Sequence, residues 1–129
     1  MISADEMLER FKPRSVLDGN EVFLRKPDVL ALVEDVANED LAFLGFEAFE
    51  FDETYVKPRL DYIADFSPRR REGNWHEYQS ANIASSRAFL AVLPDDLAVV
   101  SVLWTRQEWE ALPGIKREQS LKDENTDAN

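Results

Sequence analysis

The chain of 129 residues contains no cysteine and few glycines. Without thiols, it cannot form disulfide frameworks, thiolate zinc sites, iron–sulfur clusters or cysteine nucleophiles. Its four glycines form neither the phosphate-loop pattern nor the G-x-G-x-x-G dinucleotide pattern. We therefore expect neither a cofactor nor a metal, and a fold that depends on its hydrophobic core.

Long apolar runs and clustered positive charge are scarce as well. No stretch approaches the roughly 18 apolar residues that a membrane span needs, and the start MISADEMLERF does not resemble a signal peptide. The net charge of -11 disfavours nucleic-acid binding, because affinity for phosphates needs clustered lysine and arginine. We expect a cytoplasmic protein that binds neither membrane nor nucleic acid. Its charge suits a basic partner, although such a charge also simply keeps proteins soluble.

The residues that are present suffice for one core. Hydrophobic residues make up 44% of the chain, which predicts one compact domain. From residue 114 onward the sequence is polar and contains no aromatic residue. We therefore expect a single domain over residues 1–113 and a poorly ordered tail over 114–129.

Helix starts are marked by three capping-box patterns, in which Ser, Asn or Thr precedes a Glu by three positions. Their caps are Ser3, Asn74 and Thr105. They predict a short first helix, a long helix that ends before Pro94, and a short last helix. Pro27 suits the first turn of a further amphipathic helix.

Three segments have the composition of strands. Leu41 to Phe51 and Tyr55 to Phe66 are predicted to form a hairpin, and Pro58 places the second of these strands at a sheet edge. The apolar run from Leu97 to Trp104 is typical of a strand covered on both faces. The predicted fold class is α+β: a small antiparallel sheet of about three strands, ordered second, first, third, with helices packed mainly on one face.

The hairpin mixes aromatic and acidic residues on both faces. In its first strand Phe46 and Glu50 share one face while Glu47 and Phe49 share the other, so a bulge is expected near Gly45 or Glu47. One face of its second strand is expected to carry Val56, Leu60, Tyr62, Ala64 and Phe66. The opposite face is expected to carry Tyr55, Lys57, Arg59, Asp61 and Asp65.

Four stretches together resemble a family of small bacterial immunity proteins of polymorphic toxin systems, immunity protein forty. They are LRKPDVLALVEDVANEDLAFLGFEAFEFDE, VKPRLDYIADF, EYQSANIASSRAFLAVLP and LAVVSVLW, and they cover roughly Leu24 to Trp104. The family's motif positions would be taken by Leu44, Gly45, Phe46, Glu47 and Phe49, then by Pro58, Asp61 and Tyr62. The chain departs from the pattern where Phe46 replaces a second glycine and where Ile63 and Ala64 follow Tyr62.

The resemblance implies a binding protein without catalytic activity that blocks a cognate toxin. Steering of a basic toxin surface is assigned to the carboxylates of Glu47, Glu50, Asp52, Glu53, Asp61 and Asp65. Buried contact area is assigned to Phe49, Tyr55 and Trp75, although Trp75 is most simply a core residue.

Two other functions stay open. Carboxylates on paired strands can lie about 5 to 9.5 Å apart, as in glycoside hydrolases, which would make the chain a small carboxylate-dependent hydrolase. Alternatively, an exposed strand edge would pair with a second copy in a self-associating regulatory or structural protein. His76, the single histidine, lacks both a nucleophile motif and a second imidazole, so we expect it to be a solvent-exposed residue.

Overall fold

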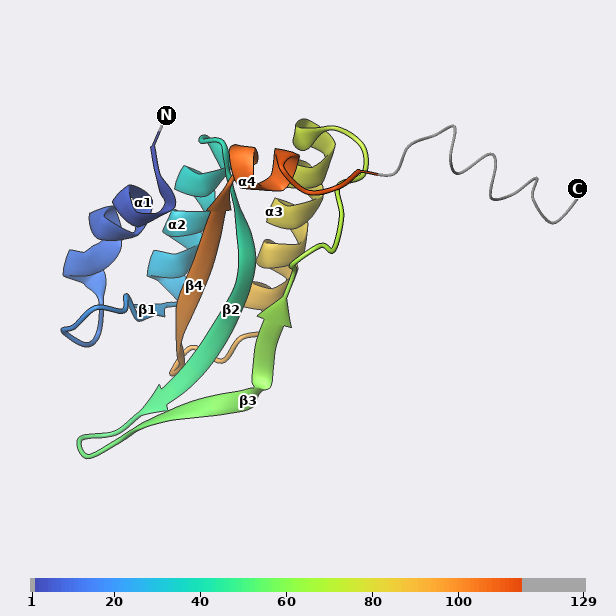
Figure 1. Cartoon of the computed structure of the whole chain (residues 1–129). Coiled ribbons are helices and arrows are strands. Elements are labelled where there is room, and N and C mark those ends of the chain that lie inside the picture. Colours follow the sequence, from blue (N-terminus) through green and yellow to red (C-terminus); the bar gives the residue numbers. More distant parts are fainter. Residues whose placement is uncertain (1, 115–129) are drawn as a thin grey trace, which may run out of the picture.

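A computed structural model describes residues 2–114 of the chain (Figure 1). Its elements in chain order are α1 (Ala4–Phe11), a 3-10 turn (Lys12–Arg14), β1 (Leu24–Arg25), α2 (Lys26–Ala37), β2 (Leu41–Phe51), β3 (Val56–Asp65), α3 (Trp75–Ala91), β4 (Ala98–Thr105) and α4 (Arg106–Glu110). The predicted tail lies outside the described residues except for Gly114, which forms a parallel bridge with Arg71.

The predicted helix caps are confirmed. The side chain of Ser3 accepts a hydrogen bond from the Glu6 N–H at 3.1 Å, and that of Asn74 accepts one from the Glu77 N–H at 2.9 Å. At Thr105 both halves of the capping box with Glu108 are present. These caps satisfy N–H groups that an α-helix leaves without an internal partner at its start.

The four strands form one antiparallel sheet in the order β1-β4-β2-β3. The α+β class is confirmed, and the three predicted strands lie in the predicted order with the Pro58-containing strand at an edge. Strand β1 is an addition that the three-strand prediction missed, because a two-residue strand has too few positions to show alternation.

One face of the sheet carries the main core. Helices α1, α2 and α3 all contribute to it, and the strands add Phe43 and Phe46 from β2 and Leu103 from β4. A second, smaller cluster contains Ala42, Trp75, Trp104 and Trp109. Ala42 pairs with Trp104 and therefore shares its face, opposite to the face of the neighbouring pair Phe43 and Leu103. The second face is thus covered by the tryptophan cluster at the α4 end and by Phe23 beside Phe49 and Phe51 at the hairpin end.

A bulge in β2 is confirmed near Gly45, and a second irregularity lies between β2 and β3 beside Glu47. Leu44 has no partner in β4, because Phe43 pairs with Leu103 and Gly45 with the next residue, Val102. On the β3 side the register shifts between Glu47 and Ala48. The first irregularity brings Phe43 and Phe46 onto the same core face, although an odd number of positions separates them.

The predicted faces of β3 are confirmed for Tyr62, Ala64 and Phe66, which pack on the core, but they are wrong before the second irregularity, which inserts residues into β3 itself. Glu47 pairs with Ile63 and Ala48 with Arg59, so residues 60–62 have no partner in β2. Val56 pairs with Phe51 on the same face as Ile63, and not on the face of Ala64. Three extra residues reverse the alternation, which a sequence pattern of period two does not register.

Helix α3 takes the place of a strand beside the first residues of β2. The Asn82 side chain accepts from the Phe43 N–H and donates to the Phe43 carbonyl, both at 2.8 Å, and Gln79 donates to the Leu41 carbonyl at 2.9 Å. β3 ends at Asp65, so it does not reach these groups. The polar residues on the inner face of α3 therefore satisfy buried backbone groups that would otherwise destabilise the sheet.

Candidate docking surface

The second face of the sheet beyond the tryptophan cluster is partly exposed to solvent, and we call this region the open face. Cross-strand pairing places on it Val100 and Val102 of β4, Glu47, Phe49 and Phe51 of β2, and Val56, Ile63 and Asp65 of β3. Directly opposite residues in an antiparallel pair project to the same side. The open face therefore combines three strands and both apolar and acidic side chains.

Large apolar side chains are exposed on this face. Val102 is 47% exposed, Ile63 49% and Val56 45%, while Leu60 and Tyr55 of the same hairpin are also exposed. A depression of about 290 Å³ lies between Val102 and Ile63, over Gly45. A Cβ on Gly45 would meet the Ala64 carbonyl oxygen at 2.3 Å, so close approach of β3 requires a glycine here.

Towards the hairpin, aromatic rings continue the open face. Phe23 packs edge-on against Phe49, with ring centroids 5.3 Å apart, and against Phe51 at 5.6 Å. Both rings of β2 are half-buried as a result. Phe49, predicted to anchor a partner, is therefore only partly accessible, whereas the predicted anchor Tyr55 is 46% exposed.

Two of the predicted acidic residues lie on the open face. Glu47 and Asp65 are both exposed, and neither forms an ion pair within residues 2–114. Asp65 accepts hydrogen bonds from the side chain and the N–H of Ser67, and these bonds lower the pKa of its carboxyl group. Asp65 consequently keeps its negative charge throughout the neutral range.

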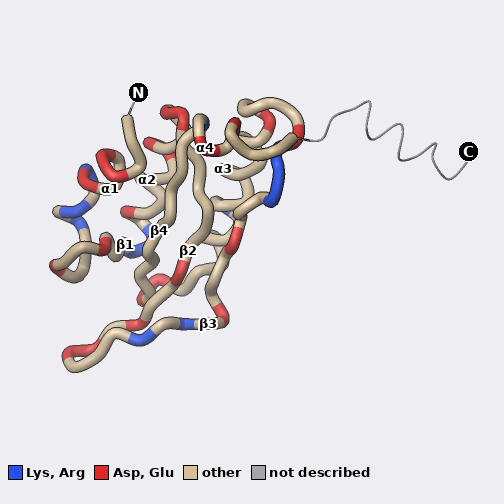
Figure 2. Tube along the Cα trace, viewed as in Figure 1, with Lys and Arg blue, Asp and Glu red and all other residues tan. Residues whose placement is uncertain are grey.

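Asp52 and Glu53 lie at the tip of the hairpin. The Asp52 carboxylate accepts from the Thr54 N–H at 2.8 Å and from its hydroxyl at 3.0 Å, which closes the turn. Figure 2 shows the acidic tip at the end of the hairpin that extends away from the helices. This position makes the tip accessible to a partner that approaches the open face.

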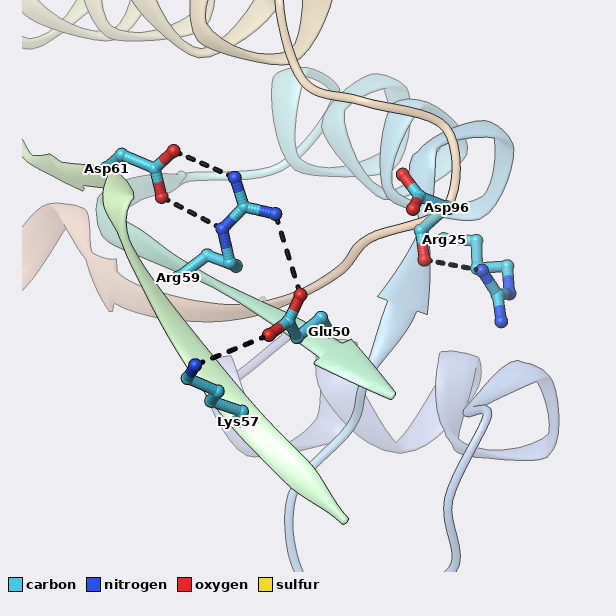
Figure 3. A network of polar contacts seen from close by, with 6 residues as sticks. All are labelled: Arg25, Glu50, Lys57, Arg59, Asp61 and Asp96. Atoms are coloured by element: carbon cyan, nitrogen blue, oxygen red, sulfur yellow. Dashed lines mark hydrogen bonds and ion pairs between the residues drawn. The ribbon is translucent and has the colours of Figure 1, made fainter. Parts of the chain in front are cut away.

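Glu50 and Asp61 belong to a network with basic residues (Figure 3). The Arg59 guanidinium donates to both oxygens of Asp61 at 3.0 and 2.9 Å and lies 3.7 Å from a Glu50 oxygen. Lys57 lies 3.9 Å from the other Glu50 oxygen. Two carboxylates thus meet two cations, and this part of the predicted acidic surface is close to neutral.

The same network limits what these carboxylates can do chemically. The hydrogen bonds from Arg59 lower the pKa of Asp61, and the same interaction raises the pKa of Arg59. The general acid of a glycoside hydrolase instead needs a raised pKa, so that it carries a proton at neutral pH. Asp61 is therefore an ionised hydrogen-bond acceptor and is poorly suited to donate a proton.

Trp75 does not belong to the accessible surface, which corrects its assignment as a partner anchor. It is only 2% exposed and packs against Tyr78 at 5.7 Å and Trp109 at 5.6 Å between ring centroids. Aromatic residues at a helix start are as typical of a core as of an interface, and Trp75 belongs to the core because α4 folds over it.

The single histidine, His76, is exposed to solvent as predicted.

Sequence reasoning missed Val102 and Ile63 as candidate contact residues. Val102 lies inside an apolar run that was interpreted as covered on both faces, which holds for the α4 end of β4 but not for its middle. Ile63 alternates regularly with Tyr62 and Ala64, which pack on the core, and its exposure follows from the open middle of the second face. The glycine at position 45 was the one available signal, because it marks the irregular part of β2.

No described helix has the length and apolar composition to cross a membrane. Comparisons with protein-family models, with curated proteins and with solved structures give no match to the chain. Membership of the immunity protein family therefore stays a prediction that rests on the sequence motifs.

Proposed function

We propose that this protein is a cytoplasmic immunity protein that binds and neutralises a cognate bacterial toxin through the open face and the hairpin tip. The observation that carries the proposal is the presence of exposed Val102, Ile63 and Val56 beside Glu47 and Asp65 on one face of the sheet. The sequence resemblance supplies the class of partner. Its first motif, Leu44 to Glu47, coincides with the bulge and the floor of the depression.

An apolar patch with a polar rim is the usual composition of a surface that binds another protein. The apolar side chains would slow dissociation, because they lose contact with water in the complex. The carboxylates would raise the rate of association with a basic toxin surface.

The contribution of each predicted residue follows from its surroundings. Glu47, Asp65, Asp52 and Glu53 are assigned to steering, whereas Glu50 and Asp61 contribute less because Arg59 and Lys57 offset their charge. Tyr55 and the exposed part of Phe49 supply contact area at the hairpin end. Trp75 stabilises the fold and makes no contact with the toxin.

The direct test is rescue of cells that express a toxin-domain protein encoded by a neighbouring gene, if the genome carries one there. Val102→Lys inserts a charge into the open face, and Val92→Lys makes the same change at the end of α3, where Val92 is 69% exposed. The wild type and Val92→Lys are expected to restore growth, whereas Val102→Lys is expected to weaken binding by about tenfold or more and to lose rescue. Equal rescue by the two variants contradicts the proposed surface, and cells that die despite the wild type contradict the immunity function.

Steering is tested separately by association kinetics. Reversing both charges with Glu47→Lys and Asp65→Lys is expected to lower the association rate and its dependence on salt. Glu72→Lys is the control, because Glu72 is exposed and lies in the loop before α3. An unchanged salt dependence in the double variant would remove the assigned role of the two carboxylates.

A further inference from the structure

A groove of about 480 Å³ runs between α1 and the edge of β4, away from the depression on the open face. One side is formed by Ala4, Asp5, Leu8 and Glu9 of α1 with Lys12, another by residues 20–22, and the floor by residues 100–103 of β4. Its volume falls within the range of about 300 to 1,000 Å³ that is usual for ligand sites.

Among the strands of residues 2–114, none pairs with the edge of β4 in this groove. The Phe43 N–H and carbonyl both bond to Asn82, so Phe43 and its partner Leu103 do not bond to one another across β2 and β4. Backbone groups alternate in direction along a strand, and those of Leu103 and Ser101 therefore point away from β2. β1 pairs only with Val99 and Ala98 on that side.

The chain before β1 does not extend the pairing along β4. Val16 donates its N–H to the Phe23 carbonyl at 2.9 Å, and the Ser15 hydroxyl oxygen accepts from the Phe23 N–H at 3.0 Å. This loop is thus bonded to itself before β1 begins, and pairing with β4 starts only at Leu24. The N–H and carbonyl groups of Ser101 and Leu103 provide two donors and two acceptors that no described backbone group uses.

A buried hydroxyl group in the lining points to a ligand as well. Ser101 is 6% exposed, and its Oγ has no hydrogen-bond partner within residues 2–114. A buried polar atom without a partner is unusual in a folded protein, because its desolvation is not compensated. A polar group of a bound chain would supply the missing bond.

The charge of the groove indicates the composition of that chain. Asp5, Glu9 and Glu21 contribute three carboxylates, while Lys12 contributes one ammonium group 3.7 Å from Glu9. The lining therefore carries an excess of negative charge and suits lysine or arginine. An unpaired strand edge in turn suits an extended backbone, as in binding modes in which a peptide adds a strand to a sheet.

We propose that this groove binds an extended, basic segment of a partner protein, which pairs with Ser101 and Leu103 as an added strand. The inference does not rest on the proposed function, because the groove and the depression on the open face share only Val102 among their lining residues. Val102 borders both sites, so experiments on the groove use variants at Glu9 and Glu21 instead.

Selection from displayed random peptides of about eight residues, long enough to span the edge as a strand, tests the proposal on the full chain. Peptides rich in lysine or arginine and in β-branched residues are expected to be enriched. The best of these peptides is then synthesised in two forms, with N-methyl groups on either the odd or the even residues. The form whose methyl groups replace the N–H groups that bond to β4 should lose binding, and the other form should keep it. The proposal is overturned if no such peptides are enriched, or if both N-methylated forms bind as well as the unmodified peptide.

Variants locate the binding site on the chain. The double variant Glu9→Lys and Glu21→Lys is expected to bind the selected peptide about tenfold more weakly, whereas Glu72→Lys should bind it like the wild type. In the complex, the amides of Ser101 and Leu103 should exchange their hydrogens more slowly. Equal binding by all variants, or unchanged exchange at both amides, contradicts binding in the groove. If the free chain forms a dimer in which these amides are already protected, a second copy occupies the edge, and the proposal is overturned as well.

Discussion

Strand β2 has different neighbours at its two ends. At the α4 end, Leu41 and Phe43 bond to side chains of α3, and both faces of the sheet are covered by core clusters. At the hairpin end, Phe49 and Phe51 pair with β3 in the part of the sheet that extends away from the helices (Figure 1). One continuous strand thus begins in the core and ends in a solvent-exposed part of the sheet.

The two ends of β2, a strand of eleven residues, therefore have different roles: one stabilises the fold and the other is available for binding. Burial at the α4 end stabilises the fold, because apolar area and backbone groups are both removed from water and satisfied there. The hairpin end leaves apolar and charged groups exposed to solvent, and changes there are expected to affect binding more than folding. Substitutions at the two ends of β2 therefore distinguish the two roles.

The largest expected effect is at the buried aromatic residue Phe46. It is 1% exposed and stacks on Phe89, with ring centroids 5.3 Å apart. Phe46→Ala should lower the free energy of unfolding by about 3–5 kcal/mol, because it removes a core ring and leaves a cavity. Phe51→Ala, at the hairpin end, should lower it by only about 1–2 kcal/mol. Denaturant unfolding of both variants measures the difference, and equal losses would contradict the division of β2.

The second effect concerns the helix that replaces a strand. Asn82→Ala leaves the N–H and the carbonyl of Phe43 without partners in a buried place, so a loss of about 2–4 kcal/mol is expected. Asn38→Ala removes an exposed hydrogen bond to the Glu34 carbonyl and should change stability by less than about 0.5 kcal/mol. If denaturant unfolding gives similar values for the two variants, α3 does not act as a substitute for β3.

The third effect is at the close contact between β2 and β3. Gly45→Ala places a methyl group against the Ala64 carbonyl and should destabilise the protein by about 1–3 kcal/mol, with faster hydrogen exchange in β3. Gly114→Ala meets only ordinary contacts, the nearest at 3.5 Å, and should be close to neutral. If Gly45→Ala has the same free energy of unfolding and the same hydrogen exchange in β3 as the wild type, β3 can move away from β2 without loss of stability, and the prediction is wrong.

The smallest effect is electrostatic. Arg59→Gln removes the donor that lowers the pKa of Asp61, and this pKa should rise towards its ordinary value of about 3.9. Asp65 is an internal control, because its pKa is lowered by Ser67 and should not change. An NMR titration of both carboxyl groups measures the two values, and a shift of Asp65 alone would contradict the assigned cause.

The pH dependence follows from the direction of the Asp61 shift. A carboxyl group whose pKa is lower in the folded chain binds protons more readily when unfolded, so its contribution to stability is present above about pH 4. That contribution is lost as the pH falls through the folded-state pKa. Arg59→Gln should therefore unfold less steeply with acid than the wild type, by a small amount because the pair is exposed.

Local signals in the sequence determined the helices and the strand order. A cap and the residue it serves are three positions apart, so Ser3, Asn74 and Thr105 marked their helices without knowledge of the fold. Pro58 indicated an edge strand for an equally local reason, since it has no N–H to donate. The bulge in β2 was predicted as well, because aromatic and acidic residues alternate inconsistently between its two faces beside Gly45.

Only the tertiary structure decided which side chains are accessible. Trp75 is covered because α4 folds over it, and Val102 is exposed because no described element covers the middle of the sheet on that side. The charge of Asp61 is offset because Arg59 lies between it and Glu50. Each outcome depends on contacts between distant segments or on a shift in register. Composition and periodicity describe one segment at a time, so the faces of this sheet were determined only when its strands and helices came together.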